Sequence, residues 1–492
     1  MTYIVFLPGI QGAELYEKSP PSGRCARVWP PHVFSCPRTI SVPVSWLGRK
    51  TLRAGHPIDD IDGCVEIYEP LDDITEAAGF KDVTSDQAPH RRLAYGYDWR
   101  ADLLTTAHAL ADDLDQVKFH GNEELILLAH SMGGLICRLL LESGAFNKRP
   151  WFSRIRRFYA LSTPHLGSLE ILAKHLRLHT IAGAKGDPRV VLSDPAFPAG
   201  YQLLPPPSCF APGQRPLVLD SRGRVVDIYS PDGASALELN LDLLERAREV
   251  WSKLDIKKRP TTVKYRSFNG SRTTTVQQVM QSASGRWSLA ETNDGDGGVP
   301  DWSLSHGGIE LRRFKGEHLQ FLKGAEFAIA LGEQLSTLKV GAFSLSAKRL
   351  ERLERVEVQT NDLGYFPLQP VHISVFLHGA APWGADTQID LQRISAAQEG
   401  DADKAILDFS SVGGARMPLA DGLRITLPAP EEPGAYRVAL RIKGILVGAS
   451  TAFVVSARSE TPEDLEFSPL PDASETSKRR ATPKKARRRA PR

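Results

Sequence analysis

The stretch ELILLAHSMGGLICRLL, residues 124–140, decides how this chain folds. Residues 125–128 form a short, wholly apolar run, which is typical of a buried parallel strand, and the residues from 135 onwards favour a helix. Between them, residues 129–133 (Ala-His-Ser-Met-Gly) must turn the chain sharply, which requires very small residues two before and two after the serine. We therefore predict a strand, a tight turn that exposes the Ser131 hydroxyl, and a helix. The adjacent His130 points away from Ser131 on such a turn and is interpreted as a packing residue.

Three compositions follow one another along the chain. Up to about residue 338, strand-like runs alternate with helix-like stretches, which predicts an α/β domain with a largely parallel sheet. From 339 to 457 the apolar period changes to two, as in Val371, Ile373, Val375 and Leu377, which predicts an antiparallel, immunoglobulin-like β-sandwich. Residues 458–492 are too poor in apolar residues to fold and are predicted to be a disordered tail.

Composition excludes several classes of protein. A chain of 492 residues with 41% hydrophobic and 24% charged residues is long enough for two or three folded domains. The sequence contains no uninterrupted apolar run of about 18 residues, and its first ten residues lack a signal-peptide pattern. The expectation is a cytoplasmic protein. The five cysteines form no C-x-x-C pair, so we expect reduced thiols rather than a zinc site.

The positive charge is concentrated at the end of the chain. Residues 478–492 hold nine of the 61 Lys and Arg residues, which leaves 52 against 58 Asp and Glu in the remainder. Clustered basic residues interact with phosphates, but this tail has no interleaved aromatic residues, so we expect no specific nucleic-acid binding. The remaining interpretations, in order, are a solvated tail and a peripheral tether to anionic membrane.

A serine nucleophile also needs two backbone N–H groups that stabilise a negatively charged oxygen. One should be the amide of Met132, at the start of the predicted helix. The other is expected in a loop after an early strand, where residues 6–12 read FLPGIQG. Gly9 and Gly12 allow the backbone to turn inward there, which would present the amide of Ile10.

Several motifs resemble the lecithin:cholesterol acyltransferase family of α/β hydrolases, which includes lysosomal phospholipase A and plant phospholipid:diacylglycerol acyltransferases. The matching pieces occur in the family's order and span roughly residues 3–335. They are LPGIQGAEL (7–15), YEPLDDITEAAGF (68–80), YGYDWR (95–100), AHSMGG (129–134), STPHLGS (162–168), YQLLPPP (201–207), NGSRTTT (269–275) and NDGDGGVP (293–300). The resemblance implies an α/β-hydrolase fold and a catalytic triad.

In this fold the acid and then the histidine follow the serine in the chain. Asp294 and Asp296 are both candidates for the acid, and the family pattern Gly-Asp-Gly-Thr-Val selects Asp296. His306 and His318 both follow the acid. We predict His318 as the base, because it lies between the last strand and the last helix, whereas His306 lies before that strand.

Residues 169–260 interrupt the strand–helix rhythm and are predicted to form a cap over the substrate. The bulky residues Leu203, Leu204, Phe210 and Trp251 are candidates for lining an acyl-chain pocket, or alternatively for the cap's own core. The family's Asp98-Trp99-Arg100 segment is interpreted as a structural ion pair under the active site.

The sequence therefore predicts a serine esterase, lipase, phospholipase or O-acyltransferase that forms an acyl-enzyme on a lipid-like ester. No metal or organic cofactor is expected. The alternative is an inactive hydrolase scaffold whose β-sandwich binds a partner, although that partner is not specified by the sequence. Because every proposed catalytic residue precedes residue 335, a chain ending near Leu335 is expected to keep most of its activity.

Overall fold

The computed structural model of the protein describes residues 1–18, 25–30, 42–43, 52–61, 65–83, 90–179, 184–185, 192–336, 356–360, 364–377, 384–396, 407–442, 445–446 and 451–455. The predicted domain boundary at residues 338–339 and the predicted tail, residues 458–492, lie outside these residues.

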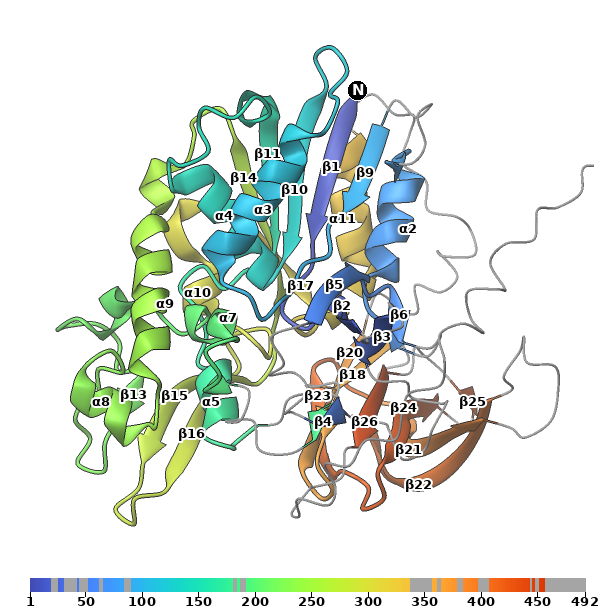
Figure 1. Ribbon diagram of the computed structural model, residues 1–492. Helices are drawn as coiled ribbons and strands as arrows, with labels where there is room; N and C mark the ends of the chain where they lie inside the picture. The colour runs from blue at the N-terminus through green and yellow to red at the C-terminus, as the bar shows by residue number, and fades with distance from the viewer. Residues whose placement is uncertain are drawn as a thin grey trace, which may run out of the picture.

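A parallel sheet forms the centre of the first part of the chain (Figure 1). In the described residues it has seven strands in the order β17–β14–β11–β10–β1–β9–β8, and all neighbours are parallel. The strands are β1 (Thr2–Leu7), β8 (Lys81–Asp82), β9 (His90–Ala94), β10 (Glu124–His130), β11 (Ile155–Leu161), β14 (Lys264–Ser271) and β17 (Glu310–Lys315). The central strands β1 and β10 are almost entirely buried, as expected for a parallel sheet covered on both faces. The predicted α/β class is confirmed.

Helices cover both faces of this sheet. Figure 1 shows α3 (Leu103–Asp115) and α4 (Met132–Glu142) in front of it and α11 (Ala325–Ser336) behind it, where α11 contacts α2 (Glu69–Ala77). The Asp102 side chain begins α3 by accepting hydrogen bonds from the amides of Leu104 and Thr105. All residues of α4 are buried, so the helix that follows Ser131 is held from every side.

The described residues of the stretch 169–260 form a group of helices, turns and short strands beside the central sheet (Figure 1). Its helices are α5 (Glu170–His175), α7 (Pro198–Gln202), α8 (Pro231–Ala236) and α9 (Leu241–Lys253), with the 3-10 turns η2 (Pro207–Phe210) and η3 (Ile256–Lys258). The Asn240 side chain caps α9, which packs against α7. A strand of this group, β13 (Val218–Leu219), pairs with β15 (Thr275–Gln281), which in turn pairs with β16 (Trp287–Thr292).

Smaller elements complete this part. The antiparallel sheet β3–β2–β5 joins β2 (Ala13–Lys18), β3 (Cys25–Trp29) and β5 (Leu52–Pro57). Short pairs join β4 (Val42–Pro43) to β12 (Ala184–Lys185) and β6 (Asp60–Ile61) to β7 (Val65–Glu66). The remaining helical turns are η1 (Phe152–Arg154), α10 (Asp301–Leu304), η4 (His306–Gly308) and η5 (Gln320–Lys323).

Two further sheets, here called the C-terminal sheets, follow residue 355. One has the order β18–β20–β23 and the other β19–β26–β24–β21–β22, with β25 on β24. Their strands are β18 (Val356–Thr360), β19 (Gly364–Tyr365), β20 (Pro370–Leu377), β21 (Asp386–Ala396), β22 (Leu407–Pro418), β23 (Leu423–Pro428), β24 (Gly434–Ile442), β25 (Ile445–Leu446) and β26 (Thr451–Val455). All pairs are antiparallel except β19 with β26. The alternating residues Val371, Ile373 and Val375 are fully buried in the shared core of these sheets.

Within the described part of the chain, no helix combines the length and the apolar character needed to cross a bilayer.

Candidate active site

Ser131 stands at the sharp turn between β10 and α4. Its φ of 52° lies in a region that residues with a side chain rarely adopt, and such strain persists only where the surroundings enforce it. The start of α4 packs closely against Thr163, and this requires glycine at position 134. A Cβ atom at Gly134 would lie 1.9 Å from Thr163 Oγ1. The methyl group of Ala129 is fully buried, so alanine fits where glycine is usual. The structure thus has the predicted strand, turn and helix.

Ser131, His318 and Asp296 are joined by hydrogen bonds. His318 Nε2 lies 2.8 Å from Ser131 Oγ, and His318 Nδ1 lies 2.8 Å from Asp296 Oδ2. A carboxylate accepts only, so Nδ1 carries the proton and Nε2 accepts from the serine hydroxyl. This is the arrangement in which a histidine can take a proton from serine.

Asp296 is fully buried and firmly held. Its Oδ1 accepts hydrogen bonds from the amides of Gly298 (3.0 Å) and Val299 (2.7 Å), which leaves Oδ2 for His318. Gly298 also packs against the base, because a Cβ atom there would lie 3.0 Å from Cγ of the His318 ring. A glycine at this position therefore leaves room for the imidazole.

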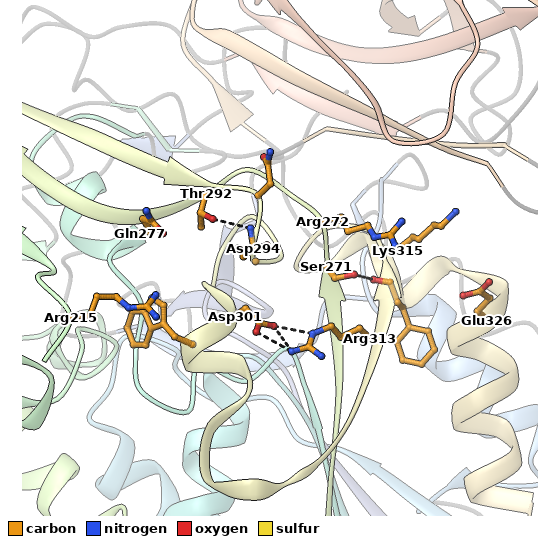
Figure 2. A pocket seen from close by; sticks show the side chains of 14 residues that line it. Arg215, Ser271, Arg272, Gln277, Thr292, Asp294, Asp301, Arg313, Lys315 and Glu326 are labelled. Atoms are coloured by element: carbon orange, nitrogen blue, oxygen red, sulfur yellow. Dashed lines mark hydrogen bonds and ion pairs between the residues drawn. The ribbon is translucent and has the colours of Figure 1, made fainter. Parts of the chain in front are cut away.

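The alternative acid and base lie elsewhere. Asp294 is exposed and lines a second cavity of about 650 Å³, where its amide donates to Thr292 and Arg313 pairs with Asp301 (Figure 2). His306 begins η4, the turn before β17, whereas His318 follows β17. The structure therefore brings Asp296 and His318, and neither Asp294 nor His306, to Ser131.

The loop after β1 passes directly beside the serine. A Cβ atom on Gly9 would lie 2.9 Å from Ser131 Cβ, so only glycine allows this approach. Ile10 lines the cavity next to Ser131. Met132 is the first residue of α4, and the first amides of a helix have no partner inside it. The positions of Ile10 and Met132 are compatible with the predicted pair of oxyanion donors.

His130 takes part in a buried hydrogen-bond chain. The Gly9 amide donates to Tyr68 Oη (2.9 Å), Tyr68 Oη lies 2.9 Å from His130 Nδ1, and His130 Nε2 lies 2.9 Å from the carbonyl oxygen of His318. The carbonyl can only accept, so Nε2 carries the proton and the tyrosine hydroxyl donates to Nδ1. Burial, together with the neighbouring His318, lowers the pKa of His130 to about 3. Neutral His130 thus connects the loop after β1, through Tyr68, to the backbone of His318.

A cavity of about 250 Å³ opens at Ser131. Its walls are mostly apolar and come from the loop after β1, the residues that follow β5, β7 and β17, the end of β3, and α5. They include Ile10, Trp29, Ile58, Ile67, Ile171 and Leu319. Its charged lining residues include Glu170 and Lys174, which lie 3.5 Å apart, and Glu317. Burial would raise the pKa of Glu170, but His179 and Lys174 outweigh it and lower that pKa to about 2.

Of the four predicted pocket residues, only Leu203 lines this cavity. Leu204, Phe210 and Trp251 are buried in the cap's own packing instead. The Trp251 indole N–H donates to the Leu204 carbonyl oxygen (3.1 Å), and the Phe210 ring packs edge-on against Tyr229. Their bulk made them candidates for either the pocket or the cap's own core, and the contacts of these three place them in the cap's core.

The segment around Trp99 forms hydrogen bonds with the loop after β1. Arg100 is buried and forms a two-bond ion pair with Asp98, at 2.6 and 2.9 Å. Trp99 donates to the Ala13 carbonyl oxygen (3.1 Å), and Tyr97 donates to that of Pro8 (2.7 Å). These bonds hold both ends of the loop that carries Ile10.

A family model described as lecithin:cholesterol acyltransferase matches residues 85–180, which include Ser131 and end before Asp296. The resemblance found in the motifs is thereby confirmed. The match supports assigning the chain to the proteins that resemble lecithin:cholesterol acyltransferase, a family of the α/β-hydrolase superfamily. The matched domain suggests acyltransferase-like or lipase-like activity.

Other comparisons add little. A search of curated proteins found no match. The sporulation control protein Spo0M of Bacillus subtilis is 15% identical with a TM-score of 0.14, and the match covers 22% of this chain and 49% of that one. A β-glucosidase of Listeria innocua is 12% identical with a TM-score of 0.15, covering 49% of this chain and 36% of that one. The chain thus spans half or less of either protein, and TM-scores this low carry no argument about fold or function.

Proposed function

We propose that the protein is a serine-dependent lipid acyl-ester hydrolase or O-acyltransferase with Ser131, His318 and Asp296 as its catalytic triad. The observation that carries this proposal is the hydrogen-bond chain from buried Asp296 through His318 to Ser131. The fold proposed with it is an α/β hydrolase over residues 1–338, capped by residues 169–260 and followed by a β-sandwich over residues 339–457.

In the proposed reaction, Ser131 Oγ attacks the ester carbonyl carbon while His318 Nε2 takes the hydroxyl proton. Asp296 stabilises the resulting imidazolium, and the amides of Ile10 and Met132 stabilise the negatively charged oxygen. The tetrahedral intermediate then expels the alcohol, which takes the proton from His318, and leaves an acyl-serine. Water, or an alcohol in the transferase case, attacks this ester with His318 as the base and restores the serine.

The cavity supports an acyl chain as the bound part of the substrate. Its aliphatic and aromatic walls stabilise a hydrocarbon chain by removing apolar surface from water, at about 25 cal/mol per Å². His130 also lines this cavity and is neutral, and an uncharged imidazole is compatible with an apolar substrate chain.

A fluorophosphonate probe tests the nucleophile. Peptide mapping of the labelled protein is expected to place the probe on Ser131, with no label on a Ser131→Ala variant. Product analysis on phospholipid, triacylglycerol and p-nitrophenyl esters, with and without an acceptor alcohol, then separates hydrolysis from transfer. A folded protein that takes no label at Ser131 and releases no acyl chain would instead favour the inactive scaffold.

A further inference from the structure

The loop that carries the proposed base also contacts the C-terminal sheets. This base loop, residues 316–319, follows β17. The Glu317 amide donates a buried hydrogen bond of 2.9 Å to Oε1 of Gln359, a residue of β18 that is 4% exposed. The backbone of Gly316 packs on the same carboxamide, since a Cβ atom there would lie 2.9 Å from Gln359 Nε2.

The backbone around the base is therefore held from two sides. On one side, His130 donates to the carbonyl oxygen of His318. On the other, Gln359 accepts from the amide of Glu317, the residue directly before His318. One of the two supports, His130, ends β10 directly before Ser131, and the other comes from the C-terminal sheets.

Further contacts fix the C-terminal sheets against the site. Lys315, at the end of β17, forms an ion pair with Asp421 (2.9 Å) and donates to the Leu377 carbonyl oxygen (2.9 Å). Arg424 of β23 donates to Thr274 and to Asn293, which lies three residues before the acid. The next residue of β18, Thr360, lines the cavity at Ser131.

From these contacts we infer that the C-terminal sheets complete the active site, with Gln359 as a positioning residue for His318. This inference rests on the proposed function. It differs from the sequence-based expectation that a chain ending near Leu335 keeps most of its activity, because such a chain lacks the acceptor for Glu317. Without this acceptor the Glu317 amide loses its hydrogen bond, and the base loop would shift to find another partner.

The test substitutes Gln359 in the full-length chain. Gln359→Met keeps the length of the side chain and removes the acceptor, whereas Gln359→Glu retains an acceptor oxygen. A misplacement of about 1 Å at a catalytic group costs about 100-fold in rate, so we expect kcat of Gln359→Met on a soluble p-nitrophenyl ester to fall roughly 10- to 100-fold with little change in KM. Gln359→Glu should recover most of this loss. Rates are normalised to the number of sites that react to completion with fluorophosphonate.

Gln392 provides the matched control. It is a buried glutamine of β21 that accepts from Arg437 inside the C-terminal sheets, so Gln392→Met should leave kcat unchanged. If Gln359→Met does not fold, Gln359→Asn, which withdraws the acceptor by one methylene, takes its place in the same assay. An active wild type with an equally active Gln359 variant would overturn this inference alone. A wild type that neither reacts with the probe nor cleaves esters would overturn the proposed function and the inference with it.

Discussion

Ser131 and His318 interact through a single hydrogen bond, and the rest of the fold depends little on it. Ser131→Ala removes the proposed nucleophile and, among the residues that the structure describes, a single side-chain hydrogen bond, that to His318. We expect kcat on a p-nitrophenyl ester to fall by about 10³-fold or more with an unchanged melting temperature, as when a serine nucleophile is removed from other enzymes. His318→Ala should be nearly as damaging, because Ser131 then has no base.

His306 is the control for this first prediction. It follows the same acid in the chain but lies in η4 before β17, so His306→Ala should change kcat only slightly. If His306→Ala were the more damaging of the two histidine variants, the base would have to be reassigned.

His130 makes the stability of the fold depend on pH. Its pKa is lowered to about 3 in the folded protein, whereas an unperturbed histidine has a pKa of about 6.5. Between these values the unfolded chain binds the additional proton, so the free energy of unfolding falls as pH is lowered from about 6.5 towards 3. At about 1.36 kcal/mol per pKa unit, this contribution is of the order of several kcal/mol.

The second prediction follows from that linkage. His130→Gln cannot titrate, so its melting temperature should decline less steeply than that of the wild type between pH 7 and 4. Melting at pH 8, where His130 is neutral in both states, measures what the substitution costs in packing. Parallel declines for both proteins would show that His130 is not the titrating group.

Residue roles were predictable from sequence to different degrees. Ser131 has a local signature, because the turn requires particular small neighbours, whereas Asp296 and His318 were selected by chain order and family pattern. Tyr68 was missed, although it lies within one of the quoted motifs, because a tyrosine in an apolar setting looks like ordinary core. Its role depends on contacts with Gly9 and His130, 59 and 62 residues away in the chain.

At the scale of elements, the turn from β10 to α4 depends on the space left at Gly134. A Cβ atom there would overlap Thr163, at 1.9 Å from Oγ1 and 2.6 Å from Cγ2. We expect Gly134→Ala to lower the free energy of unfolding by about 1–3 kcal/mol, as overpacking does in other cores. Urea unfolding of the purified variant measures the loss.

Two control variants test whether the overlap with Thr163 causes the loss of stability in this third prediction. Adding Thr163→Ala to Gly134→Ala removes the two closest atoms and should restore part of the stability. Gly413→Ala in the exposed part of β22, where a Cβ atom would meet nothing within 4 Å, should change stability by less than about 0.5 kcal/mol. A double variant no more stable than Gly134→Ala would argue against the overlap as the cause.

Elements with strong periodicity were predicted from sequence, and elements defined by distant pairing were not. The apolar runs of β1 and β10 and the alternation along β20 are local patterns. The pairing of β13 with β15, by contrast, joins residues about sixty positions apart through two residues of β13. No local period specifies such a pair, which is why the cap looked like an insertion ending near residue 260.

At the scale of the whole molecule, the change of period after residue 338 suggested two units that act separately. The contacts of Gln359, Lys315 and Arg424 across these units argue for a joint active site instead. Such contacts involve single polar side chains far apart in sequence, and hydrophobic periodicity does not predict them. The family motifs do not predict these contacts either, because the motifs end before the C-terminal sheets.

The basic tail is predicted to affect the location of the protein in the cell and not its catalytic rate. Residues 478–492 carry nine positive charges and lie outside the described residues. Each basic residue near an anionic membrane contributes about 1 kcal/mol, so we propose that the tail tethers the protein to a surface that holds its substrate. Replacing these residues with a Gly/Ser segment of equal length should reduce sedimentation with phosphatidylserine vesicles and leave turnover of a soluble ester unchanged.

The salt dependence of vesicle binding tests whether the attraction in this fourth prediction is electrostatic. The Debye length shrinks from about 10 Å at 0.1 M to about 3 Å at 1 M ionic strength, so an electrostatic tether should fail as salt rises. Binding to neutral phosphatidylcholine vesicles should be weak for both proteins at every salt concentration. If the two proteins sediment equally with anionic vesicles at low salt, the tail is only solvated.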